Sequence, residues 1–154
     1  MVTGKPTHPA RQISRLRTSP HPMKNSLVPG VRGEIKQKVV SNHLVSHYHP
    51  EGPAVFGSPF MLMAMEFAAF EAIRPHLDQG EQSVGVEFQF VHMAATPAGA
   101  TVTARAEVLA VEGQKVTLRI EAHDEQEMIG RGTHVRHVID VQRFLKRTRR
   151  KTAE

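Results

Sequence analysis

Glu66 is the residue of this chain with the clearest chemical potential. It is the only charged residue in the stretch 60–70 (FMLMAMEFAAF), whose other members are Phe, Met, Leu and Ala. As a helix, this stretch is apolar on nearly every face and should be buried. A buried ionised carboxylate costs several kcal/mol unless it is paired, and a carboxylate removed from water is a stronger base. The pattern favours a carboxylate that moves protons, and leaves open a solvated seam or an ion pair with an arginine.

Histidines form a second group of potentially reactive side chains. His43, His47 and His49 lie within 43–57, a stretch that also contains two prolines and two glycines. Their spacings of four and two residues suit a metal, but no acidic or cysteine ligand accompanies them in a fitting pattern. We therefore expect a loop, with a short strand or turn at its start, and no metal site.

The helix that carries Glu66 has a recognisable beginning. Ser58 is a preferred N-cap residue, and Pro59 suits the first helical position, where its missing N–H would be unpaired anyway. The stop signal at 78–80 (DQG) predicts an end near Leu77. Pro75 is able to end the helix earlier.

Five segments have the pattern of strands: 31–40, 83–93, 100–111, 114–123 and 128–141. Glu112 and Gly113 form a hairpin signal between the third and fourth of them. In 83–93, His92 is in register with an apolar stripe, which predicts that it faces the helix. The stripe consists of Val84, Val86, Phe88 and Phe90.

The order of these elements predicts an α+β hotdog fold. A strand, a long apolar helix and four more strands form one antiparallel sheet wrapped around a central helix. A single sheet cannot cover such a helix completely, so the remainder should meet a second copy. We therefore expect a homodimer.

Composition excludes several function classes. The chain of 154 residues contains no cysteine, which rules out disulfides, thiol nucleophiles and cysteine-ligated zinc and fits a reducing compartment. No apolar run approaches the roughly 20 residues of a membrane span, and residues 1–25 lack the apolar segment of a secretory signal. We expect a cytoplasmic protein with no membrane partner.

The net charge of +5 is unevenly distributed. Residues 1–25 hold five bases and no acid, residues 143–154 hold six bases and one acid, and residues 26–142 hold nine bases and fourteen acids. An acidic centre is not typical of a nucleic-acid-binding domain. We predict a single domain over 26–142 between two basic, solvated and disordered tails. A role of the tails in binding nucleic acid, an acidic partner or a phosphorylated ligand stays open.

Three motifs resemble a known family. They are SPFMLMAME at 58–66, VHMAATPAG at 91–99 and GRGTHVR at 130–136. Together they are similar to the thioesterase-like hotdog superfamily, in the branch of the fluoroacetyl-CoA thioesterases, and the similarity covers roughly residues 40–145. The resemblance implies hydrolysis of an acyl-CoA thioester without a metal or another cofactor.

The resemblance also assigns site residues. The catalytic positions of the family fall on Ser58, Glu66 and His92, and those that line the acyl end fall on Gly85 and Arg136. Three of these residues also have a purely structural alternative. Arg136 could form an ion pair that only supports the fold, Ser58 could only cap the helix, and His92 could be an ordinary strand histidine.

This chain departs from the family pattern at the start of the helix. Serine replaces a threonine at 58, and Pro59 replaces a glycine and removes one N–H group. The loop before Ser58 is shorter and lacks the phenylalanine-bearing lid of the fluoroacetyl enzyme, for which Phe56 is a partial substitute. We therefore expect a short or small acyl group other than fluoroacetyl.

Helix geometry limits how these residues can meet. Eight residues of helix span about 12 Å, so Ser58 and Glu66 of one chain should not touch. Two antiparallel helices across a two-fold axis would bring Ser58 of one subunit to Glu66 of the other. The competing readings are an enoyl-CoA hydratase, disfavoured because the helix lacks an aspartate, and a non-catalytic hotdog protein that binds acyl-CoA or a partner.

Overall fold

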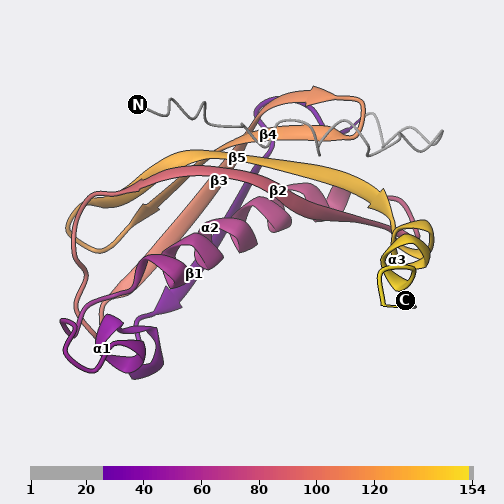
Figure 1. Ribbon diagram of the computed structural model, residues 1–154. Helices are drawn as coiled ribbons and strands as arrows, with labels where there is room; N and C mark the ends of the chain where they lie inside the picture. Colours follow the sequence, from indigo (N-terminus) through magenta and orange to yellow (C-terminus); the bar gives the residue numbers. More distant parts are fainter. Residues whose placement is uncertain (1–25, 153–154) are drawn as a thin grey trace, which may run out of the picture.

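The computed structural model describes residues 26–152, so the predicted N-terminal tail lies outside the described residues. One antiparallel sheet curls around a long helix, α2, and confirms the predicted α+β hotdog fold (Figure 1). The elements are β1 (Arg32–Lys38), η3 (Ser41–His43), α1 (Val45–Tyr48), α2 (Ser58–Ile73), η4 (Arg74–His76), β2 (Glu81–His92), β3 (Thr101–Glu112), β4 (Lys115–His123), β5 (Met128–Asp140) and α3 (Val141–Arg149).

The sheet has the strand order β1-β3-β4-β5-β2, so β1 and β2 form its edges. All five predicted strands are present with small shifts at their ends. Gly113 has a φ of +60° and makes the predicted turn between β3 and β4. In the pairing of β2 with β5, His92 lies opposite Gly130 and Glu81 lies opposite Asp140.

Small side chains allow α2 to lie close to the sheet. The buried face of α2 consists of Met61, Ala64, Met65, Ala68, Ala69, Ala72 and Ile73. Where β1 crosses the helix, a Cβ on Gly33 would collide with the backbone of Ala68 and Ala72. The other face of α2 keeps Met63 and Phe67 37% and 49% exposed.

Both ends of α2 differ from the prediction. Gly57 is the N-cap, so Ser58 and Pro59 are the first two helical residues, and no side chain caps the helix. The helix ends at Ile73, earlier than Leu77, and continues as the 3-10 helix η4. Pro75 accounts for the early end, because it has no N–H to donate to the preceding turn.

The alternation expected along β2 is broken by a β-bulge between Gly85 and Glu87. Gly85 pairs with Arg136, whereas Val84 pairs with His137 on the opposite face. The expectation that Val84 shares a face with His92 is therefore wrong. A bulge shifts the side-chain register by one residue, and here it turns Gly85 toward α2.

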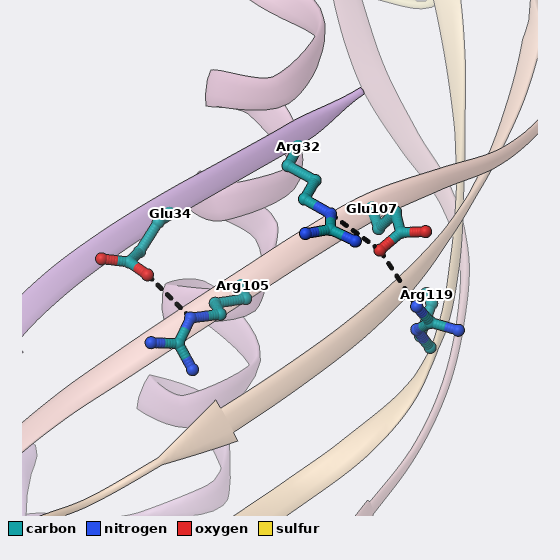
Figure 2. A network of polar contacts seen from close by, with 5 residues as sticks. All are labelled: Arg32, Glu34, Arg105, Glu107 and Arg119. Carbon is teal, nitrogen blue, oxygen red and sulfur yellow. Dashed lines mark hydrogen bonds and ion pairs between the residues drawn. The ribbon is translucent and has the colours of Figure 1, made fainter. Parts of the chain in front are cut away.

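The outer face of the sheet carries a network of ion pairs (Figure 2). The Glu107 carboxylate accepts from Arg32 and Arg119, each at 3.0 Å, and Arg105 donates to Glu34 at 2.7 Å. Solvated pairs of this kind contribute little to stability. They explain why the outward positions of these strands are polar.

The predicted disorder of the C-terminal tail is wrong for residues 143–149, which form most of a helix. Residues 143–149 belong to α3, whose N-cap Asp140 accepts a hydrogen bond from the backbone N–H of Arg143 at 2.8 Å. An aspartate cap satisfies one of the free N–H groups at a helix start, a signal that was present in the sequence. Within residues 26–152, no helix is long and apolar enough to cross a membrane.

Candidate active site

Ser58 and His92 meet where α2 begins and β2 ends. The Ser58 Oγ lies 2.8 Å from the His92 Nδ1, and the His92 Nε2 lies 3.0 Å from the carbonyl oxygen of Ala94. Because a carbonyl oxygen only accepts, the Nε2 carries the hydrogen and the Nδ1 of the neutral ring accepts from the Ser58 hydroxyl. The structure thus aims the Ser58 proton at a base, and His92 faces the helix as predicted.

The backbone around Ser58 leaves one donor available beside this hydroxyl. The N–H groups of Phe60 and Met61 donate to the Gly57 carbonyl, and Pro59 has no N–H. The Ser58 N–H has no partner within residues 26–152. Free N–H groups at a helix start favour a negative charge, so this position suits an oxyanion.

Glu66 lies farther along α2 and pairs with Arg136. The Arg136 Nη1 donates to the Glu66 Oε1 at 3.0 Å, and 40% of the Glu66 side chain is exposed. The Glu66 carboxylate was expected to be buried, but in the single chain it is partly exposed. The structure shows the ion pair with an arginine, which the sequence had left as an alternative. The Glu66 Oε2 has no hydrogen-bond partner among the described residues.

Arg136 is held by more than the carboxylate. It is 3% exposed, and it donates to the Ser83 Oγ at 3.0 Å and to the Ser83 carbonyl at 2.7 Å. Burial lowers the pKa of Arg136, while the hydrogen bond to Glu66 opposes that shift. A guanidinium with this many fixed partners holds Glu66 in one orientation.

His134 completes this cluster, although its sequence position alone predicted no role for it. Its Nδ1 donates to the Glu87 carbonyl at 2.8 Å, and its Nε2 accepts from the Arg136 Nη1 at 3.1 Å. The ring is fully buried and stacks on the Phe88 ring, with the two ring centroids 3.6 Å apart. Burial lowers its pKa to about 4, helped by the Arg136 charge and opposed by the Glu87 hydrogen bond. The sequence did contain one indication of this role: His134 lies two residues before Arg136, and residues at that spacing share one face of a strand.

Gly85 leaves space beside these groups. A Cβ at this position would lie 3.1 Å from the Glu66 Oε1 and 3.0 Å from the His134 Cε1. Gly85 and Arg136, both assigned to the acyl end by resemblance, therefore lie around Glu66.

The structure does not bring all three candidate catalytic residues together in one chain. Ser58 contacts His92, whereas Glu66 lies two helical turns away, about 12 Å along the axis. Phe56 is fully buried and packs edge-on against His43. In the single chain this side chain belongs to the core, and the interpretation of Phe56 as a partial lid stays a prediction.

The histidines of the segment before α2 do not form a metal site. Among residues 26–152, no three His, Asp or Glu side chains are placed to hold an ion. His43 instead packs on Phe60 with ring centroids 5.0 Å apart. As predicted, most of the segment 43–57 is a loop; it begins with the short helix α1, and Leu44 forms an isolated β-bridge with Phe56.

Comparisons with known proteins identify the family. The family described as fluoroacetyl-CoA-specific thioesterase matches residues 37–142. A fluoroacetyl-CoA thioesterase from Streptantibioticus cattleyicolor is 40% identical over 136 residues, which cover 84% of this chain and 98% of that protein. This chain belongs to the fluoroacetyl-CoA-specific thioesterase family.

Solved structures agree with this membership in the fluoroacetyl-CoA-specific thioesterase family. A threonine-to-serine variant of the fluoroacetyl-CoA thioesterase in complex with acetyl-CoA is 41% identical, with a TM-score of 0.75, over 80% of this chain and 98% of that chain. A hot-dog-like protein from Thermanaerovibrio acidaminovorans is 25% identical, with a TM-score of 0.78, over 84% of this chain and 97% of that one.

Proposed function

We propose that this protein hydrolyses the thioester of a small acyl-CoA to the free acid and coenzyme A. The observation that carries the proposal is the hydrogen bond of 2.8 Å between the Ser58 hydroxyl and the His92 Nδ1. Relatives support the substrate class, since one is named a fluoroacetyl-CoA thioesterase and another was solved with acetyl-CoA. The cytoplasmic location stays a prediction.

The first half of the reaction uses Ser58 and His92. As the Ser58 Oγ attacks the thioester carbon, its proton moves to the His92 Nδ1, and the Nε2–H stays bonded to the Ala94 carbonyl. The oxyanion accepts from the Ser58 N–H. When the C–S bond breaks, the sulfur takes the proton from His92, and the acyl group remains on Ser58.

The second half requires a water and a base for it. The Glu66 Oε1 is bound by Arg136, which leaves the Oε2 to take a proton from water. Water attacks the acyl carbon as its proton moves to the Glu66 Oε2, the acyl–oxygen bond breaks, and the same proton passes from Glu66 to the leaving Ser58 oxygen. Because Glu66 lies about 12 Å from Ser58 of its own chain, we assign this step to Glu66 of the partner subunit.

A homodimer is the second part of the proposal. Met63 and Phe67 expose apolar surface on α2, and β2 is an edge strand of the sheet with a free edge for pairing. Pairing two β2 strands across a two-fold axis would continue the sheet, cover this surface and run the two α2 helices antiparallel. Ser58 of one subunit would then approach Glu66 of the other.

The test is a thiol-release assay over a panel of short acyl-CoA esters. Ser58→Ala should lower kcat at least a hundredfold, whereas Ser41→Ala, which removes an exposed hydroxyl outside the site, should leave it unchanged. Mixed dimers of Ser58→Ala and Glu66→Gln chains should regain activity in the one site that keeps both groups. Release from no ester by the wild type would contradict the hydrolase and favour a binding protein. Inactive mixed dimers would place the site within one chain.

A further inference from the structure

Helix α3 and residues 150–152 form a cationic surface, with six bases and no acid from 141 to 152. We call this surface the α3 patch; its cations are Arg143, Lys146, Arg147, Arg149, Arg150 and Lys151. None of them forms an ion pair within residues 26–152. On the outer face of the sheet, by contrast, Arg32, Arg105 and Arg119 are paired with glutamates (Figure 2). Unpaired cations concentrated on one helix favour an anionic ligand.

The α3 patch lies far from the Ser58–His92 pair of its own chain. Helix α3 follows Asp140, which pairs with Glu81, whereas His92 pairs with Gly130 at the other end of β5. Ten residues of strand separate these ends by about 33 Å. Figure 1 shows α3 at the end of the sheet opposite α1.

The proposed two-fold axis brings the α3 patch to the other site. Along α2, Ser58 contacts His92 of β2 and Glu66 lies beside Gly85. The exposed Met63 and Phe67 therefore lie beside residues 85–88 of β2. A two-fold axis through this part of β2 would pair the strand with β2 of the partner subunit, centred on residues 85–88. Residue 92 of the partner would then lie opposite a residue near Glu81, which adjoins Asp140 and α3.

We propose that α3 of one subunit binds the phosphates of the coenzyme A whose thioester lies at Ser58 and His92 of the partner subunit. The nucleotide end of coenzyme A carries a pyrophosphate and a 3′-phosphate, and arginine and lysine are the usual ligands of such groups. Arg143, Lys146 and Arg149 line one hollow on α3, together with Gln142 and Leu145. This inference rests on the proposed hydrolysis and dimer.

The first experiment removes charge from the α3 patch. The triple variant Arg143→Gln, Lys146→Gln and Arg149→Gln should raise the KM for acyl-CoA about tenfold with kcat unchanged. The KM for the corresponding acyl-pantetheine, which lacks the nucleotide, should not change. A matched control, Arg32→Gln, Lys36→Gln and Arg105→Gln, removes the same charge from the outer sheet face and should behave as wild type.

Mixed dimers test whether the contact crosses the interface. In a dimer of one triple-variant chain and one Ser58→Ala chain, only one active site keeps the Ser58 hydroxyl. That hydroxyl comes from the triple-variant chain, and the unaltered α3 comes from the Ser58→Ala chain. The active site of this dimer should show the wild-type KM for acyl-CoA. A raised KM would place the contact within one chain and overturn the proposal.

Other outcomes separate this inference from the proposed function. An unchanged KM in the triple variant, an equal rise in the control, or an equal rise for acyl-pantetheine would overturn phosphate binding by α3 while hydrolysis stands. Failure of the wild type to cleave either ester would overturn the proposed function. Calorimetric titration with coenzyme A alone would then still test α3, because the triple variant should bind it about tenfold more weakly.

Discussion

His92 and His134 carry their ring protons on opposite nitrogens. In His92 the Nε2 donates to a carbonyl and the Nδ1 faces a hydroxyl, whereas in His134 the Nδ1 donates to a carbonyl and the Nε2 faces Arg136. An arginine has no acceptor, so the His134 Nε2 must be unprotonated. His92 is therefore placed to receive a proton, and His134 to orient a neighbouring cation.

Two amide substitutions at His134 separate its hydrogen bonds. His134→Gln places an oxygen near the Nε2 position and keeps the acceptor for Arg136, whereas His134→Asn keeps a donor for the Glu87 carbonyl and loses that acceptor. We expect the Asn variant to lose about tenfold in kcat, because Arg136 no longer holds Glu66, and the Gln variant to stay near wild type. Steady-state kinetics, with thermal unfolding as the check on folding, decide between them. Equal losses in both would mean that the ring only supports the fold.

The depressed pKa of His134 also predicts a pH dependence of stability. Burial lowers this pKa from 6.5 to about 4, so the unfolded chain takes up a proton at a pH where the folded chain does not. The free energy of unfolding should therefore fall as the pH decreases from about 6.5 to 4, by up to ~3 kcal/mol from this group. Urea unfolding measures this free energy at each pH, and in His134→Gln it should depend less steeply on pH over that range. The same dependence on pH in both proteins would assign the effect to other groups.

At the scale of elements, the contact between β1 and α2 depends on the absence of a side chain. Gly33 lies against the backbone of Ala68 and Ala72, and backbone cannot move aside as a flexible side chain does. The alanines of α2 and this glycine therefore set the distance between helix and sheet.

Gly33→Ala should lower the free energy of unfolding by about 1–3 kcal/mol, the usual effect of adding a methyl group to a packed contact. Gly113→Asn is the control, because Gly113 has open space around it and asparagine tolerates its positive φ. Chemical denaturation of both variants measures the difference. A Gly33→Ala protein as stable as the control would show that the helix shifts freely away from β1.

At the scale of the whole molecule, the exposed apolar face of α2 predicts the dimer. Phe67→Glu should produce a monomer in sedimentation velocity and lower kcat at least tenfold, since a charge in that interface would lack a partner. Leu109→Glu is a matched control, because Leu109 is 42% exposed and lies on β3 rather than on α2. A monomeric wild type, or a Phe67→Glu protein that stays dimeric, would contradict this interface.

Local patterns were sufficient to predict most of the elements. Alternation along each strand and the apolar character of 60–70 depend on neighbouring residues alone, and the five strands and α2 followed from them. His92 was correctly predicted to face the helix for the same reason. Glu66 stood out because a single charge in an apolar stretch requires an explanation.

Contacts between distant segments decided the rest. The bulge at Gly85 and Glu87 exists only in the pairing of β2 with β5, and it turns Gly85 toward Glu66. Arg136 meets Glu66 across 70 residues of chain, and it also donates to His134 on its own strand. The hydroxyl of Ser58 was free to cap the helix as far as the sequence could tell, and it bonds to His92 because β2 ends beside it. Hydrogen bonds that join segments far apart in the chain leave no local pattern, and so only the tertiary structure assigned these partners.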